Sequence, residues 1–561
     1  LHPPGYPLWC LLARAFATLL PVGDFAWRVN LFSGFSISLA CALGGRLLRR
    51  RGVGPAGAVS GAALGGLADA VWGQSVIAEV YGATLLGVFG SLLALDRWRE
   101  VPTPRRFAVL LFVGGLSLCL QPLARGLLPI FLAYAFLERP GLLKDGRSLA
   151  LGALALLVGL LPILYLPIRS AADPFLDWGN PETPGALWNH VTLRQYTHGE
   201  ELGMDPPTFL GFGPRMERFG EVLLAQFPLP VLGLAGIGVL LAARRWGKFG
   251  ALLLATALAT SVGLVYATSL RDAFFFPPAY ETYSLPSFAL LGLLSGAALD
   301  GLRGWKLGRL LAPPLALVAV AWTAAENAPR NDRSEDRFFE PFARALLENV
   351  EPNGVLLAAG DHLVFPSLFL QRVRKVRTDV HLPQRYGTFE ESELGALTME
   401  ERARRRTLHG APRLAFDAGM VVRRWIATRP VYVVGIPFDP GACSGLEGSV
   451  VTPEGMLLRI SLPGTLSPAE AREKDEGAWR RLSFPPLEDA SPDRSVRLAV
   501  ALVRMTRGLH RVRMGDIEGA RSDLMSLLRN DLIDAPSLVV GARALAAAGA
   551  REDAAALLRE A

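Results

Sequence analysis

Residues 165–196 read YLPIRSAADPFLDWGNPETPGALWNHVTLRQY and lie between two long apolar parts of the chain. The prolines and glycines in this segment exclude one continuous helix, because proline lacks a backbone donor and both residues favour turns. A long connection that is rich in polar and aromatic side chains is typical of a binding site. We therefore predict a site here, with an ordinary solvated loop as the alternative. Its candidate side chains are Arg169, Asp173, Asp177, Trp178, Asn180, His190, Arg194 and Tyr196.

The composition places this segment in a membrane protein. The chain has 561 residues, of which 51% are hydrophobic, and its mean hydropathy is +0.31. Apolar runs of about 18 to 23 residues, long enough for an α-helix to cross a bilayer, recur up to residue 326. We predict a mainly α fold: a polytopic membrane helical bundle over 1–326, a small soluble α/β domain over 336–465 and a tetratricopeptide-like helical segment over 495–561.

Two parts of the membrane region are each compatible with more than one helical arrangement. Residues 1–22 are proline-rich and contain Arg14, so we predict an interfacial amphipathic helix there rather than a span. Residues 107–137 are interrupted by Gln121, Pro122 and Arg125, which favours a hairpin of two helices over one tilted helix. The predicted spans are 26–48, 56–73, 76–95, 107–121, 123–137, 149–168, 222–243, 249–268, 283–300 and 310–326.

The basic residues indicate how these spans are oriented. Most of the lysines and arginines in residues 1–326 fall in alternate short loops, and such loops face the cytoplasm. We therefore predict that Leu1, the loop 169–220 and the chain after residue 326 share the outer side, which is the periplasm if the protein is bacterial. The cytoplasmic set comprises Arg46, Arg49, Arg50, Arg51, Arg97, Arg99, Arg105, Arg106, Arg139, Lys144, Arg147, Arg244, Arg245, Lys248, Arg303, Lys306 and Arg309.

Several classes of function lack support in the sequence. The net charge of +7 is explained by these loop arginines and does not indicate nucleic-acid binding. The four cysteines show no paired spacing, so neither a disulfide framework nor a zinc site is predicted. No Walker-type phosphate loop, His-Glu-x-x-His motif or Ser-His-Asp esterase signal occurs. ATP-driven transport and zinc hydrolysis are therefore disfavoured.

Five motifs in sequence order carry a resemblance to a known family. They are HPPGYPLW (residues 2–9), AWRVNLFS (26–33), WGQSVIAEVY (72–81), the YLPIR…WGNP…RQY loop and NGVLLAAGDHLVFPSLFLQRVRKVRTDV (353–380). Together they resemble the membrane family catalogued as domain of unknown function 2723. Its animal member is an O-mannosyltransferase of plexin-type receptors.

The resemblance implies a GT-C-like membrane glycosyltransferase that takes its sugar from a polyprenyl-phosphate carrier on the outer face. In this family an acidic catalytic motif precedes HPPG, and the sequence begins at Leu1 without it. We therefore expect further residues upstream and no activity without them. A second departure is Gln121-Pro122, where the family more often has Asn-His. No cofactor is implied beyond the donor substrate, and the need for a divalent metal stays open.

Transfer from such a donor requires a carboxylate for the acceptor proton, cations for the departing phosphate and an apolar groove for the lipid. The resemblance and the residue types assign Glu79 and His2 as catalytic. Glu79 would otherwise cap a helix N-terminus. Arg169, Arg194 and Arg125 are the candidates for the donor phosphate, with snorkelling at the membrane boundary as the alternative. The candidates for the sugar or acceptor are Tyr81, Asp177, Trp178, Asn180, His190 and Tyr196.

Two of these candidates have a structural alternative that the sequence leaves open. His190 is a lone histidine and such residues are more often structural, while Asp177 would equally cap a turn. Spacing allows His190 and Arg194 to share one helical face, with Tyr196 about a third of a turn away.

The part after residue 336 changes to an alternating pattern. We predict helices over 338–350 and 364–373 and strands over 354–360, 378–382 and 431–436, which together form a βαβ unit. Asp361 and His362 follow the first strand, where such sheets place ligands, although a structural turn is favoured. GDIEGARSDL (515–524) is echoed by GAREDAAALL (549–558) at the tetratricopeptide period, pairing Ala520 with Ala554 and Leu524 with Leu558.

These observations favour a glycosyltransferase that moves a hexose, with mannose as the leading candidate, to an extracytoplasmic protein hydroxyl or envelope glycan. Its partners would be the lipid carrier, the acceptor and a protein bound through 495–561, with no nucleic acid. We expect it in a bacterial inner membrane. The alternative is a non-enzymatic transporter or an assembly scaffold that uses its helical tail.

Overall fold

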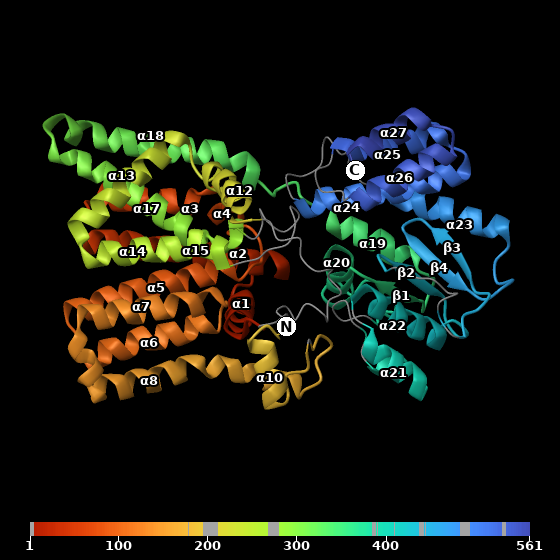
Figure 1. Cartoon of the computed structure of the whole chain (residues 1–561), viewed down its shortest axis with the longest axis horizontal. Helices are drawn as coiled ribbons and strands as arrows, with labels where there is room; N and C mark the ends of the chain where they lie inside the picture. Colours follow the sequence, from red (N-terminus) through yellow and green to blue (C-terminus); the bar gives the residue numbers. More distant parts are fainter. Residues whose placement is uncertain are drawn as a thin grey trace. The chain divides into compact units, whose positions relative to one another are not determined.

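The computed structural model describes the chain except for residues 1–4, 178, 195–210, 268–279, 384–388, 390, 409, 437–442, 444, 483–493, 530–534 and 561. It divides into two compact units (Figure 1). Of the described residues, those up to Arg333 form the membrane unit and those from Ser334 onward form the C-terminal unit.

The membrane unit is built from α-helices that run beside one another (Figure 1). Six helical segments of the described chain are long and apolar enough to cross a bilayer, and the protein is a multi-pass membrane protein. The helices are α1 (Pro7–Leu19), α2 (Phe25–Arg50), α3 (Pro55–Leu67), α4 (Asp69–Gly73), α5 (Tyr81–Glu100), α6 (Pro104–Leu118), α7 (Leu123–Glu138), α8 (Gly146–Leu160), α9 (Tyr165–Ser170), α10 (Pro184–Val191), α12 (Phe212–Ala225), α13 (Leu229–Trp246), α14 (Lys248–Ala259), α15 (Val262–Ala267), α17 (Leu285–Gly301) and α18 (Lys306–Asn331).

The predicted spans are correct in outline and wrong at several ends. The hairpin over 107–137 is confirmed as α6 and α7, and the segment predicted to be interfacial contains the short helix α1. The prediction over 222–243 merges α12 and α13, which are separated at Gln226–Pro228 because proline favours the start of a new helix. The prediction over 56–73 likewise merges α3 and α4, and the helix predicted from residue 76 begins at Tyr81.

Helices α3 and α17 approach each other backbone to backbone. Gly57, Gly61 and Gly65 follow one face of α3, and Gly292 and Gly296 follow the facing side of α17. A Cβ atom on Gly61 would lie 2.7 Å from the Leu293 carbonyl oxygen, and one on Gly292 would lie 2.3 Å from the Gly65 nitrogen. Glycine at these positions permits the close approach that membrane helices use in place of hydrophobic burial.

The basic loops meet at one end of the membrane unit. Asp96 on α5 accepts ion pairs from Arg50, at 2.6 Å, and from Arg51. Glu138 at the end of α7 pairs with Arg99 at 3.9 Å and with Lys248 at 3.7 Å. The Gly54 amide also donates to Asp300 at 2.9 Å, which brings the 303–309 loop to this end. These contacts support the assignment of all five loops to one side of the membrane.

The C-terminal unit contains a mixed four-stranded sheet. β1 (Val355–Ala358) pairs in parallel with β2 (Val431–Val434), and the sheet order is β1-β2-β4-β3. Helices α19 (Phe339–Asn349), α20 (Asp361–Arg372), α21 (Met399–Thr407), α22 (Gly410–Trp425) and α23 (Pro468–Arg481) accompany it. The strand predicted over 378–382 is wrong, since only His381 forms an isolated bridge, with Val355. The hairpin of β3 (Val450–Glu454) and β4 (Leu457–Ser461) was missed.

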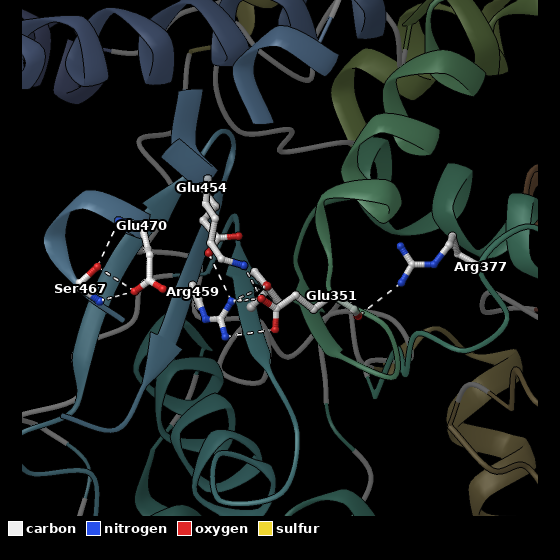
Figure 2. A network of polar contacts seen from close by, with 8 residues as sticks. Glu351, Arg377, Glu454, Arg459, Ser467 and Glu470 are labelled. Atoms are coloured by element: carbon white, nitrogen blue, oxygen red, sulfur yellow. Dashed lines mark hydrogen bonds and ion pairs between the residues drawn. The ribbon is translucent and has the colours of Figure 1, made fainter. Parts of the chain in front are cut away.

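A partly buried ion-pair network connects this sheet to the segments around it (Figure 2). The Arg459 guanidinium on β4 donates to Glu351 Oε1 at 2.5 Å and to Glu454 Oε1 at 3.4 Å. Lys474 on α23 donates to the same Glu351 carboxylate. Partial burial alone would raise the pKa of Glu351, but the hydrogen bonds from Arg459 and Lys474 outweigh it and lower that pKa. The network is structural.

The tail consists of paired helices α24 (Arg494–Met514), α25 (Ile517–Met525), α26 (Ala535–Ala547) and α27 (Arg551–Glu560). Ala520 and Ala554 are both buried, as the repeat predicts. Leu524 is also buried, but Leu558 is 54% exposed, and Leu557 occupies the buried place. The equivalence predicted for the two leucines is therefore wrong by one residue.

Candidate functional site

Glu79 lies at the end of the membrane unit opposite the basic loops, in the connection between α4 and α5. The hydroxyl of Ser33 on α2 fixes its backbone in two ways. The Glu79 amide donates to Ser33 Oγ at 3.2 Å, and Ser33 Oγ donates to the Glu79 carbonyl at 3.2 Å. The backbone of Glu79 is therefore held independently of its carboxylate.

The surroundings of Glu79 alter its acidity. The side chain is exposed on one side, yet the protein groups around the carboxyl remove enough water to raise its pKa above the ordinary value. A hydrogen bond from the Val80 backbone opposes this shift. Because a carboxyl with a raised pKa is a better proton acceptor once ionised, this environment suits a general base.

A group of tyrosines adjoins Glu79. Tyr81, the first residue of α5, packs edge-on against Tyr283 with ring centroids 5.7 Å apart. The Tyr283 and Tyr6 hydroxyls and the Glu79 carboxylate lie within electrostatic range of the Tyr81 hydroxyl. Tyr6 belongs to the HPPGYPLW motif. This neighbourhood therefore joins residues from three separate parts of the sequence.

The same N-terminal motif contacts the 165–196 segment. Gly5 has φ +86° and faces Leu166 and His190: a Cβ atom here would lie 2.5 Å from Leu166 Cδ2 and 3.1 Å from His190 Nε2. Gly179, with φ +74°, faces the other side of the ring, and its Cβ would lie 3.2 Å from His190 Nδ1. His190 is 5% exposed. Its position between two glycines favours the structural reading of this histidine.

The polar residues of the segment form a local network. The Ser170 hydroxyl lies 2.6 Å from Asp177 Oδ2 and 2.9 Å from Asn180 Oδ1, which closes the loop onto the end of α9. Arg125 at the start of α7 donates to the Val191 carbonyl at the end of α10. Arg125 thus helps to position the segment. This structural role was not part of the prediction that Arg125 binds the donor phosphate.

Arg169 and Arg194 are both exposed. Arg169 lies in the last turn of α9, directly beyond the apolar span. Arg194 donates to Asn189 Oδ1 at 3.3 Å. The predicted helical face shared by His190 and Arg194 is wrong, because α10 ends at Val191 and Leu193 takes φ +61°, which no helix continues. His2, Trp178 and Tyr196 lie outside the described residues.

The structure adds residues that the sequence did not single out. Ser33 and Tyr283 adjoin Glu79 and Tyr81. Ser33 is the last residue of the AWRVNLFS motif, which marked its position but gave it no role. Asp69 accepts a hydrogen bond from Asn331 at 2.9 Å and joins α4 to α18. Gln121, where the family pattern differs, accepts from the Leu123 amide at 2.6 Å and caps the start of α7.

Replacing Gly5 by alanine tests the contact between the N-terminal motif and the segment. We expect a loss of about 1–3 kcal/mol in the free energy of unfolding, because the left-handed backbone and the short distances to Leu166 and His190 both oppose a methyl group. Thermal unfolding in detergent measures it. Gly126→Ala is the control, since no atom outside its own stretch of α7 lies within 4 Å of the Cβ that it would add. Equal stability of the two variants would contradict the contact.

Comparison with known proteins agrees with the motifs. Residues 1–142 match the family model described as the protein O-mannosyl-transferase TMEM260 N-terminal domain, which confirms the resemblance read from the sequence. Protein O-mannosyl-transferase TMEM260 of Mus musculus is 27% identical over 407 residues, covering 68% of this chain and 56% of that protein. The Dictyostelium discoideum protein of the same name is 21% identical over 428 residues, covering 68% and 52%. The chain thus spans about half the length of these curated relatives.

Solved structures with a similar arrangement include ArnT from Cupriavidus metallidurans. Its apo form has a TM-score of 0.49 at 17% identity and covers 82% of this chain and 87% of that one. The form bound to undecaprenyl phosphate has a TM-score of 0.49 at 17% identity and covers 83% and 89%.

Proposed function

We propose that this protein is a membrane glycosyltransferase that moves a hexose from a polyprenyl-phosphate carrier to a hydroxyl on the outer side of the membrane. Mannose is the favoured sugar, because the relatives in mouse and Dictyostelium are named O-mannosyl-transferases. The acceptor is a protein hydroxyl or an envelope glycan. The observation that carries the proposal is the assembly of Glu79, Tyr81, Tyr6 and the 165–191 segment at one end of the helical bundle.

Each part of this assembly has a chemical task in the proposal. Glu79 takes the proton from the acceptor hydroxyl or orients the sugar that receives it. Arg169 stabilises the phosphate as its charge grows during departure of the sugar. Asp177 and Asn180 offer oxygen atoms to sugar hydroxyls at the mouth of the loop. Exposed apolar side chains at the end of the same span, including Ile168 at 70% exposure, suit the lipid tail.

The positions of the basic loops indicate on which side of the membrane Glu79 lies. The basic loops occupy the end opposite Glu79, so Glu79 and the segment face away from the cytoplasm under the positive-inside rule. We place the protein in a bacterial inner membrane with this end and the C-terminal unit in the periplasm.

The direct test is transfer of radiolabelled hexose from polyprenyl phosphate in membranes that contain the complete gene product. The expected result is label in a protein or glycan fraction, and its absence with each polyprenyl-phosphate hexose would overturn the proposal. A non-enzymatic transporter or scaffold gives no such label.

The Arg169→Ala variant tests whether Arg169 binds the carrier phosphate or only snorkels to the membrane boundary. If the guanidinium grips the carrier phosphate, the dissociation constant for the carrier rises about tenfold or more, since a charge-assisted hydrogen bond contributes about 1.5–3 kcal/mol. Titration of nanodisc-embedded protein with polyprenyl phosphate measures the affinity. Arg245→Ala, an exposed arginine at the opposite end, is the matched control. An unchanged affinity of Arg169→Ala would assign this arginine to snorkelling.

A further inference from the structure

The C-terminal unit encloses a cavity of about 530 Å³ that the proposed transferase chemistry does not use. It lies where the carboxyl ends of β1 and β2, the β3–β4 turn and the middle of α24 come together. Its walls are mostly apolar, and Phe342, Leu363, Val433, Met456, Leu502 and Met505 contribute to them. Cavities of about 300–1,000 Å³ with apolar walls and a few polar groups are the usual form of a small-molecule site.

The position of the cavity in the sheet also favours a ligand. Parallel strands with connecting helices leave space beyond their carboxyl ends, and ligands of α/β proteins bind there. Gly360 and Gly435 follow β1 and β2 with φ +97° and +69°, and both line the cavity. A Cβ atom on Gly360 would lie 2.9 Å from His362 Cε1, and one on Gly435 would lie 2.5 Å from the Ala359 carbonyl oxygen, so these turns leave no room for a side chain.

Four polar side chains reach this apolar space: His362, Thr506, His510 and Arg513. The His510 ring is held by Asp475, with Nδ1 2.6 Å from Oδ2. Asp475 also accepts the Gly455 amide at 2.7 Å. Asp475 is thereby committed to groups of the protein, and it is not among the residues that line the cavity.

The remaining polar groups favour a negatively charged ligand. Among the residues that the structure describes, none hydrogen-bonds to the His362 imidazole, whose pKa is lowered by burial and raised less by Asp361. Arg513 is exposed and has no ion-pair partner among the residues described. Its planar guanidinium matches the two oxygens of one carboxylate. A neutral imidazole beside apolar walls can donate one hydrogen bond without adding a charge.

We propose that this cavity binds a single-chain amphipathic carboxylate, with the chain between the sheet and α24 and the carboxylate at Arg513. The apolar walls accept the chain by the hydrophobic effect. Among the described residues that line the cavity there is one guanidinium, that of the exposed Arg513, and no carboxylate, which accounts for the choice of a monoanion. This site lies within the C-terminal unit and is independent of the proposed transfer reaction.

Photolabelling of the full chain in nanodiscs tests the proposal. The probe is a diazirine-bearing dodecanoic acid, with the corresponding alcohol as the uncharged comparison. We expect the acid to label peptides from 499–513 or 355–364, unlabelled dodecanoate to compete, and the alcohol to label these peptides several-fold less. Labelling elsewhere only, or equal labelling by acid and alcohol, would overturn the proposal.

A pair of variants tests the role of the cation. Arg513→Gln should lower labelling by the acid about fivefold at a subsaturating concentration, because the charge-assisted contact is lost. Arg543→Gln makes the same change at an exposed position of α26 that does not line the cavity, and it should leave labelling unchanged. Equal labelling of the two variants would show that no carboxylate is held at Arg513.

Discussion

Replacing Glu79 by glutamine in the complete gene product is expected to lower the turnover of hexose transfer about 10²- to 10⁴-fold, the range that a lost general base causes. The substitution keeps the size of the side chain and removes the charge that accepts the proton. Single-turnover transfer of radiolabelled sugar at saturating donor measures it. An unaltered rate would remove Glu79 from the mechanism.

The Glu79→Gln variant should keep the fold, so a loss of activity would report on the missing carboxylate and not on unfolding. Both hydrogen bonds between Glu79 and Ser33 use the Glu79 backbone, so the amide side chain leaves them intact. Glu182→Gln is the matched control, because Glu182 is an exposed carboxylate in the 165–196 segment. Equal loss of activity in both variants would point to a general effect of charge and not to Glu79.

The pH dependence of the transfer rate provides a second test of the Glu79→Gln variant. The pKa of Glu79 is raised, so its carboxylate form is lost as pH falls through a value above that of an ordinary glutamate. The transfer rate of the unmodified protein should therefore decline as the pH falls below the pKa of Glu79. The residual activity of Glu79→Gln should lack that decline.

Replacing Asp96 by asparagine is expected to destabilise the membrane unit by about 3–5 kcal/mol, since removing one partner of a buried ion pair leaves charges uncompensated. The Asp96 side chain is 3% exposed and faces both Arg50 and Arg51. The Arg51 guanidinium also lies 3.7 Å from the Phe249 ring centroid, so it has little room to reach water. Equilibrium unfolding in mixed micelles measures the loss.

Glu100 provides the control for this second result. It pairs with the same Arg50 at 2.6 Å, but its side chain is 57% exposed. Glu100→Gln should therefore change the free energy of unfolding by at most about 1 kcal/mol. If the two variants were equally stable, burial of Asp96 would not govern the strength of the cluster.

The sequence predicted those parts of the fold that depend on local composition. The α6–α7 hairpin was predicted because Gln121 and Pro122 interrupt an apolar run, which is a local sequence signal. The span 222–243 failed because Gln226 and Phe227 are compatible with a helix, and only the preference of Pro228 for a helix start separates α12 from α13. The strand at 378–382 failed because its single bridge depends on a partner distant in sequence.

For the candidate site, the sequence predicted which segments lie on one side of the membrane, and the roles of the individual residues stay predictions. Sidedness and motif order placed Glu79, Tyr81 and the 165–196 segment on the same side, and contacts through Gly5 and Tyr6 agree with this. The contact of Arg125 with the Val191 carbonyl joins residues that no periodic pattern relates. Ser33 is an unremarkable serine within an apolar helix, and its bond to Glu79 depends wholly on how α2 packs.

The glycine contact between α3 and α17 determines which parts of the membrane unit can move. Two helices whose backbones touch cannot slide or rotate without collision, so this pair behaves as a rigid body. Helix α4 follows α3 in the chain, and Glu79 lies six residues beyond the end of α4. Any rearrangement of the membrane unit is therefore expected to take place outside the α3–α17 pair.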